Sequence, residues 1–281
     1  MSFNKIKSYA KINLALNITG KTSSLHKIES IVAFVNLFDE ILIKKINSKK
    51  HNVSFSGKFS QNIGKNNTIT KLLKLLEQRK ILNYKKFQIK INKQVPIKAG
   101  LGGGSMNAAN VLKYFIKKKI IKITKKELLK ISRLIGSDVV LGLKSTNSII
   151  TSKNKIKYFS NCKKYYTLIV KPNFGCSTKD IYSKVKKFNK PIFNKPKKSM
   201  FNLNYLKEMN NSLEPIAFFK YPKLKIMKLF LESLQKPVFV RMTGSGSAIV
   251  AYFTSKERCN NAKKHFNRKY KNYWCIASKT I

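Results

Sequence analysis

One glycine-rich segment limits the possible folds of this chain more than any other part of the sequence. It reads Pro96-Ile97-Lys98-Ala99-Gly100-Leu101-Gly102-Gly103-Gly104-Ser105 and leads directly into an apolar pattern of helical spacing from about Met106 to Lys118. Glycine permits positive φ and lets the backbone approach a ligand, and the free N–H groups at a helix N-terminus attract anions. A plain turn would not need four glycines, because each costs about 0.5–1 kcal/mol relative to alanine. The segment therefore predicts a phosphate-binding loop.

Two familiar phosphate-binding motifs are excluded by the same residues. A P-loop ends in Gly-Lys-Ser/Thr, and no such ending is present. A dinucleotide-binding fingerprint needs a third glycine where Ser105 stands. The loop is thus neither of these two motifs.

A second loop of small residues, Thr243-Gly244-Ser245-Gly246-Ser247, lies between two predicted strands. Its N–H and hydroxyl donors suit a contact to an anion or a ribose phosphate. The same residues would also serve as an ordinary hairpin connection. Both interpretations stay open at this point.

The apolar periodicity predicts a mixed α+β chain with two domains, 1–160 and 161–281. The first half shows strand patterns at 5–18, 31–46 and 87–91, and helical patterns at 67–82, 106–118 and 124–134. The second half predicts strands at 165–170, 238–242, 248–253 and 273–277, helices at 205–209, 224–234 and 257–266, and a surface loop at 186–199. We expect an antiparallel sheet in the second half.

The formal charge of +48 raises the question of a nucleic-acid partner. Only five of the 59 basic residues are arginines, whereas base readout favours the bidentate arginine fork. The lysines are spread along the chain together with many asparagines and isoleucines, which indicates a bias toward A/T-rich codons. We therefore expect no nucleic-acid partner, although a positive field would attract polyphosphate substrates.

The sequence predicts a cytoplasmic protein without a membrane segment. No stretch approaches the roughly 20 apolar residues that span a bilayer, and the N-terminus leads into a strand pattern at Tyr9–Ile18 instead of a secretory signal. The four cysteines are far apart and form no CxxC pair, which favours reduced thiols and no metal site.

Asp138 and Lys11 are the candidate catalytic pair. Asp138 lies within an apolar run just after a predicted helix, where a carboxylate without a partner would carry a desolvation penalty. Lys11 interrupts the first apolar strand, although a solvent-facing position would also explain it. Together they would keep the aspartate ionised and ready to accept a hydroxyl proton. The spacing does not establish that they pair.

These motifs, in this order, resemble the GHMP kinases over nearly the whole chain. The matching segments are Tyr9 to Leu14, Asn67 to Ile69, Ala99 to Asn107, Gly136 to Val139, Asn211 to Glu214, and Arg241 to Ser247. Within the family, the chain is most similar to members that phosphorylate a cytidine diphosphate-linked methylerythritol at its 2-hydroxyl in the non-mevalonate isoprenoid pathway.

The resemblance implies a ribosomal-protein-S5-like N-terminal domain, a ferredoxin-like C-terminal domain, and ATP with Mg²⁺. It implies that Asp138 is the base or an orienting carboxylate, that Lys11 is its electrostatic partner, and that the glycine loop wraps the ATP phosphates. Asn67 would also contact ATP. The substrate would be bound by Asn13, His26, Tyr182, Thr243, Gly244 and Ser245. No protein metal ligand is expected, and we expect a monomer or a weak homodimer.

The chain departs from the family pattern at three positions. Ser24-Leu25-His26 stands where Gly-Tyr-His is usual, so one aromatic wall of a cytosine site is missing. Met106 replaces a serine after the glycines, and Val140 replaces a proline after the aspartate turn. Three alternatives stay open: a GHMP kinase for another alcohol such as mevalonate or homoserine, an RNA-associated protein on an S5-like fold, and an inactive relative.

Overall fold

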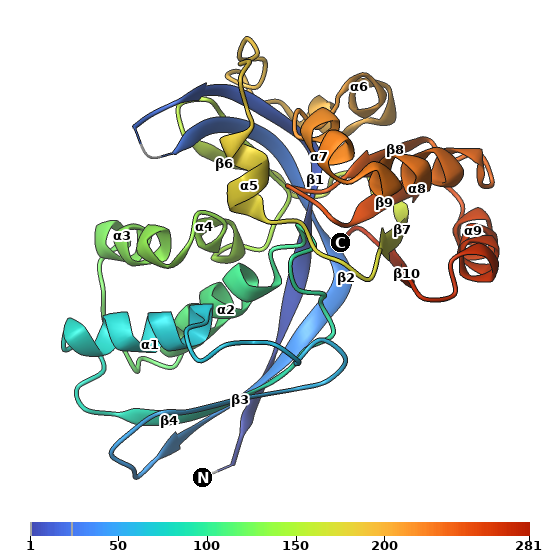
Figure 1. The fold of residues 1–281 in the computed structure, drawn as a ribbon. Helices are drawn as coiled ribbons and strands as arrows, with labels where there is room; N and C mark the ends of the chain where they lie inside the picture. Colours follow the sequence, from blue (N-terminus) through green and yellow to red (C-terminus); the bar gives the residue numbers. More distant parts are fainter. Residues whose placement is uncertain (1, 24) are drawn as a thin grey trace. The chain divides into compact units, whose positions relative to one another are not determined.

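The chain forms two compact units, each assembled from separate stretches of sequence (Figure 1). The computed structural model describes residues 2–23 and 25–281. Unit 1 comprises Met1–Ala10, Leu37–Ile97 and Gly102–Ser145, and unit 2 comprises Lys11–Asn36, Lys98–Leu101 and Thr146–Ile281. The long strands β1 (Asn4–Lys21) and β2 (His26–Ile46) contribute to both units. The predicted domain boundary near residue 160 stays a prediction, because units defined by contacts need not coincide with domains.

Unit 1 places helices on one face of a small sheet. The second half of β2 pairs antiparallel with β4 (Lys86–Asn92), which pairs parallel with β3 (Asn52–Ser56). Alternation along β2 and β4 buries one side of each strand against α1 (Thr68–Gln78) and α2 (Gly103–Lys117). The other helices of this unit are α3 (Lys125–Ile135) and α4 (Val139–Gly142). Figure 1 shows all four helices on the same side of the strands.

Unit 2 contains an antiparallel sheet of four strands in the order β10-β7-β9-β8. Its core joins apolar side chains of the sheet to those of α8 and α9. The strands are β7 (Tyr166–Lys171), β8 (Phe239–Met242), β9 (Ile249–Phe253) and β10 (Trp274–Lys279). The helices are α5 (Thr178–Ser183), η1 (Lys198–Phe201), α6 (Leu203–Glu208), α7 (Glu214–Lys220), α8 (Pro222–Ser233) and α9 (Lys256–Lys269). Two short strands, β5 (Ser148–Ile150) and β6 (Ile156–Tyr158), extend from the first half of β2.

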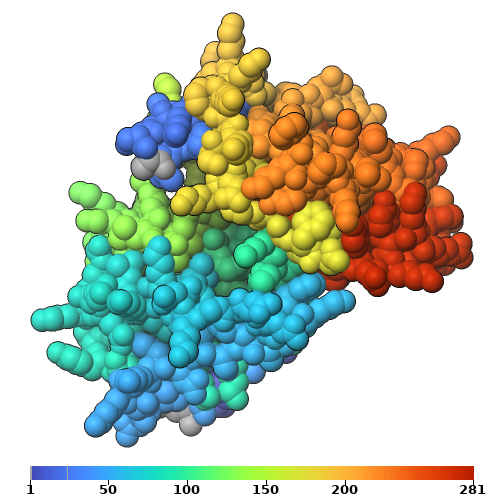
Figure 2. Space-filling model, viewed as in Figure 1, coloured from blue at the N-terminus to red at the C-terminus, as the bar shows by residue number. Residues whose placement is uncertain are grey.

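Most elements expected from periodicity are confirmed, including the antiparallel sheet of the second half. The helix after the glycines begins at Gly103, three residues earlier than the apolar pattern indicated. The segment between α5 and η1, yellow to gold in Figure 2, lies on the surface as predicted. The apolar patterns did not indicate β3, α4, β5, β6, α5, η1 or α7.

The sequence predicted neither a membrane-spanning helix nor a disulfide bond. In 2–23 and 25–281, no helix combines the length and apolarity needed to cross a bilayer. All four cysteines lie in that part of the chain, and none is disulfide-bonded.

Candidate active site

The glycine loop ends at the N-terminus of α2, a helix of 15 residues. Its N-cap is Gly102, which has φ +67° and no side chain to cap the helix. The first turn contains no acidic side chain. The N–H groups of Gly103, Gly104 and Ser105 therefore precede the first helical hydrogen bond, which Met106 donates to Gly102 at 2.9 Å. This arrangement attracts an anion such as a phosphate group.

The start of α1 lies against the same loop within unit 1. Asn67 is the N-cap of α1, and its Oδ1 accepts from the N–H groups of Ile69 and Thr70 at 3.0 and 3.1 Å. Thr68 Oγ1 donates to the Gly104 carbonyl at 2.8 Å. Capping explains the Asn67 side chain, and a contact of Asn67 with ATP stays a prediction.

The turn that contains Asp138 is also beside the first turn of α2. A Cβ added to Gly136 would lie 3.5 Å from Ser105 Oγ, so these two backbones are close. Asp138, partly exposed, occupies the N-cap position of α4. A carboxylate in this turn is therefore near the predicted phosphate site of unit 1.

In unit 2, the two small-residue loops contact each other. The Thr243 hydroxyl donates to the Gly100 carbonyl at 3.2 Å, and the Ala99 carbonyl accepts from the Ala248 N–H at 3.2 Å. The Lys98 carbonyl accepts from Ser247 N–H at 3.3 Å. Ser245 Oγ lies 2.9 Å from Thr178 Oγ1. The second loop is thus more than a hairpin connection, since it holds the glycine segment in place.

Gly100 is required at this contact. It has φ +72°, and an added Cβ would lie 1.9 Å from the Thr243 carbonyl oxygen. We expect Gly100→Ala to distort the loop, because the positive φ alone costs roughly 1–2 kcal/mol, and to raise KM for ATP. Gly64→Ala is the matched control, since an added Cβ there has open space around it. ATP titration of the initial rate tests both variants, and an unchanged KM in Gly100→Ala would contradict this role.

Lys11 is buried, with only 4% of its surface exposed, which excludes a solvent-facing strand position. Its Nζ donates to Asn13 Oδ1 at 2.6 Å. Asn13 in turn donates its side-chain amide to Ser30 Oγ at 2.8 Å and its backbone N–H to Thr243 Oγ1 at 3.0 Å. Three predicted site residues, Lys11, Asn13 and Thr243, are therefore connected in unit 2. The pairing of Lys11 with Asp138 joins residues of the two units and stays a prediction.

His26 and Tyr182, both expected near the substrate, lie together in unit 2. Their ring centroids are 5.2 Å apart. Burial, with a smaller contribution from the Lys21 charge, lowers the pKa of His26 below its ordinary value of 6.5. The imidazole is therefore neutral at neutral pH, with one donor and one acceptor nitrogen. Leu25 is exposed, and the departure at Ser24 lies outside the described residues.

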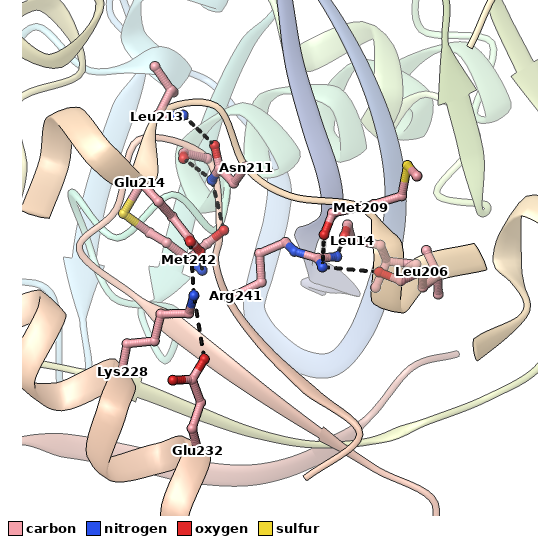
Figure 3. Close-up of polar contacts among 11 residues, drawn as sticks. Leu14, Leu206, Met209, Asn211, Leu213, Glu214, Lys228, Glu232, Arg241 and Met242 are labelled. Atoms are coloured by element: carbon pink, nitrogen blue, oxygen red, sulfur yellow. Dashed lines mark hydrogen bonds and ion pairs between the residues drawn. The ribbon is translucent and has the colours of Figure 1, made fainter. Parts of the chain in front are cut away.

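The motif residues Asn211 and Glu214 hold the backbone of the second loop through hydrogen bonds (Figure 3). Asn211 Nδ2 donates to the carbonyls of Met242 and Gly244, both at 2.8 Å. Glu214 Oε1 accepts from the Met242 N–H at 2.6 Å, and Lys228 Nζ lies 3.2 Å from its other oxygen. The backbone that enters and turns through this loop is thus fixed by side chains.

Arg241 connects this support to the first strand. Its guanidinium is buried and donates to the carbonyls of Leu14, Leu206 and Met209 (Figure 3). Leu14 follows Asn13 in β1, so the arginine fixes the strand that presents Lys11 and Asn13. The sequence showed the motif but not this positioning role, since its three acceptors are distant in sequence.

A fully buried carboxylate, Asp39, was missed by sequence reasoning. It forms an ion pair with Lys93, and accepts from the N–H groups of Gln94 and Val95 at 2.8 Å each and from Asn107 Nδ2 at 2.9 Å. Burial lowers the pKa of Lys93, and the Asp39 carboxylate opposes that shift. The alternation of the strand could have indicated its burial, because Asp39 lies on the same buried face of β2 as Ile41 and Ile43. Asp39 thus connects Gln94 and Val95, which precede the glycine loop, to Asn107 in α2.

Known proteins are similar to this chain over its whole length. The family model described as the GHMP kinases N terminal domain matches residues 67–150. A 4-diphosphocytidyl-2-C-methyl-D-erythritol kinase from Pelagibacter ubique is 57% identical over 281 residues, covering 100% of both chains. The relative of that name from Clostridium tetani is 32% identical, covering 99% of this chain and 100% of the other.

Solved structures share the fold at low sequence identity. A 4-(cytidine 5'-diphospho)-2C-methyl-D-erythritol kinase superposes with a TM-score of 0.79 at 22% identity, covering 99% of this chain and 100% of the other. A homoserine kinase from Cytophaga hutchinsonii gives 0.72 at 16% identity, covering 100% of this chain and 95% of the other. The expected α+β fold is confirmed by these similarities together with the elements described above. The chain is similar over its full length to proteins named 4-diphosphocytidyl-2-C-methyl-D-erythritol kinase, and it therefore belongs to the GHMP kinase family.

Proposed function

We propose that this protein transfers the γ-phosphoryl group of ATP to the 2-hydroxyl of 4-diphosphocytidyl-2-C-methyl-D-erythritol. The observation that carries the reaction class is the α2 N-terminus, presented by the glycine loop with the Asp138 turn beside it. The choice of substrate rests on the relative that is 57% identical over the full length. The product would serve the non-mevalonate isoprenoid pathway.

In this mechanism, the N–H groups at the start of α2 hold the phosphates of ATP. Asp138 accepts the proton of the 2-hydroxyl while that oxygen bonds to the γ-phosphorus. The bond from the γ-phosphorus to the β–γ bridging oxygen breaks, and ADP leaves. Lys11 would keep the Asp138 carboxylate ionised and would compensate the negative charge that develops during phosphoryl transfer. This division suits phosphoryl transfer, where catalysis is mostly positioning and charge stabilisation.

Mg²⁺ is the cofactor proposed to accompany ATP. The part of the chain that the structure describes contains no group of three or more His, Cys, Asp or Glu side chains able to hold a metal ion. Mg²⁺ retains waters readily and binds substrate phosphates. Mg²⁺ would then be held chiefly by the ATP phosphates and by water, and it would offset the charge of the transferred phosphoryl group.

The test is initial-rate phosphorylation by the purified chain, with mevalonate and homoserine as alternative acceptors in parallel. We expect turnover of 4-diphosphocytidyl-2-C-methyl-D-erythritol to exceed that of both alternatives by orders of magnitude. Preferred turnover of another alcohol would replace the substrate assignment. No turnover, with RNA binding that weakens steeply as salt rises, would favour the RNA-associated alternative.

We also propose that the protein acts in the cytoplasm on a small molecule, without nucleic acid or membrane, as a monomer or weak homodimer. The scarcity of arginine supports the absence of a nucleic-acid role. Light scattering at several protein concentrations tests the oligomeric state.

A further inference from the structure

A cleft of about 490 Å³ lies in unit 1, at the C-terminal end of α2. Its volume is within the roughly 300–1,000 Å³ range of small-molecule sites. Ten described residues line it, and five of them are lysines: Lys44, Lys45, Lys85, Lys118 and Lys119. Lysine and arginine together make up only 59 of the 281 residues of the chain, so the basic composition alone does not account for this share.

Acidic side chains do not compensate the charge of this cleft. None of the ten lining residues is an aspartate or a glutamate. Within residues 2–23 and 25–281, none of the five ammonium groups forms an ion pair with a carboxylate. Lys86, which follows Lys85 but does not line the cleft, is paired with Glu77. Because like charges repel, an anion that enters the cleft lowers its electrostatic energy.

The backbone at the end of α2 holds two of these lysines in place. Lys118 is the C-cap of the helix, and Lys119 has a φ of +53°. The Lys119 N–H donates to the Ile116 carbonyl at 3.0 Å, and the Ile120 N–H donates to the Phe115 carbonyl at 2.8 Å. This is the pattern of a Schellman motif, in which main-chain donors satisfy the last carbonyls of a helix. These two carbonyls therefore do not need the lysine ammonium groups as caps.

The other three lysines come from β2 and from the residue that precedes β4. Lys45 is paired with Phe87 in the register of β2 and β4. Lys44 Nζ lies 4.8 Å from the centroid of the Phe3 ring. Lys85 directly precedes β4. Three segments of unit 1 that are distant in sequence thus bring their lysines to one cleft.

Aromatic and aliphatic side chains form another part of the lining. Phe87 is buried, and Tyr114 and Ile120 are partly buried. Burial raises the pKa of Tyr114 above its ordinary value of 10.0, so its hydroxyl stays protonated at neutral pH and can donate a hydrogen bond. Apolar surface gains by leaving water. The lining therefore favours a ligand with both a phosphate group and an apolar part over a bare inorganic anion.

We propose that this cleft binds a small organic phosphate, with its phosphate groups among the five lysines and its apolar part against Phe87, Tyr114 and Ile120. The site is separate from the glycine loop, because the 15 residues of α2 lie between them and correspond to roughly 20 Å at about 1.5 Å per residue. The proposal does not depend on the proposed function, since no residue assigned to phosphoryl transfer lines the cleft.

Calorimetric titration with inorganic diphosphate tests the phosphate part. The variant Lys45→Gln/Lys118→Gln removes two charges at exposed positions and should keep the melting temperature of the unmodified chain. We expect its Kd for diphosphate at the cleft to rise about tenfold or more, since hydrogen bonds to charged groups are strong. The matched control is Lys50→Gln/Lys117→Gln, which removes the same charge from two exposed lysines outside the lining. Its Kd should stay within about twofold, because salt screens distant charges.

Gly100→Ala separates the cleft from the glycine loop, where diphosphate is also expected to bind. This variant should retain binding at the cleft. Loss of all diphosphate binding in Gly100→Ala, with full binding in Lys45→Gln/Lys118→Gln, would show that only the glycine loop binds anions. Equal weakening in the two lysine double variants would show attraction by net charge alone. Either result would overturn the site.

Competition in Gly100→Ala tests the apolar part of the ligand. Phenyl phosphate and inorganic phosphate offer the same kind of anionic group, but only the former has a ring. We expect phenyl phosphate to displace diphosphate at a concentration lower by about fivefold or more, because its ring leaves water against the apolar lining. Displacement at equal concentrations would overturn the assignment of an organic ligand.

Discussion

Asparagine in place of Asp138 is expected to lower kcat by about 10²- to 10⁴-fold, the range typical for loss of a general base. The amide has nearly the same shape but cannot accept the hydroxyl proton. Because the glycine loop still holds ATP, KM for ATP should change by no more than about twofold. Single-turnover kinetics with purified protein measure the chemical step separately from product release.

The control for this variant is Asp180→Asn. Asp180 is a surface carboxylate paired with Lys220 at 2.9 Å. Its loss should leave kcat unchanged, since exposed ion pairs contribute little to stability. If Asp138→Asn retained full kcat, Asp138 would have no catalytic role, and the residue that receives the proton would have to be sought elsewhere.

The sequence predicted those elements whose apolar pattern is long or clearly periodic. Short elements were missed for physical reasons. The strands β5 and β6 have three residues each, too few to show alternation. Helix α7 has seven residues and begins with Pro215 in its first turn, a position that proline favours but that also reads as a helix stop. The helix after the glycines begins within the glycine run, since the helix N-terminus follows Gly102 and not the apolar pattern.

The candidate site was predictable as a set of motifs but not as a set of contacts. The composition of the glycine loop and of the Thr243–Ser247 loop identified both as candidate binding loops. Their contact at Gly100 could not be predicted in this way, because it joins residues more than a hundred positions apart. Burial of Lys11 depends on the same tertiary packing. Asp39 was read as part of an apolar strand, because a single carboxylate does not disturb such a pattern.

That buried carboxylate gives the largest expected effect on stability. Asp39→Ala removes the partner of Lys93 and leaves an uncompensated charge in the core, together with the unsatisfied N–H groups of Gln94 and Val95. Breaking a buried pair in this way costs about 3–5 kcal/mol, a large part of the roughly 5–15 kcal/mol that stabilises a folded protein. We expect the melting temperature to fall by roughly 10 °C. Differential scanning calorimetry measures the change.

Glu40→Ala is the matched control, because Glu40 is the next residue and its partner Lys5 is largely exposed. Its loss should cost at most about 1 kcal/mol. If the two variants were equally stable, the buried pair would have contributed no more than a surface one. Asp39 also accepts from Asn107 in α2 and from the chain that enters the glycine loop. Below its melting temperature, Asp39→Ala should therefore also bind ATP more weakly, because the helix N-terminus that receives the phosphates is positioned by the bonds it has lost.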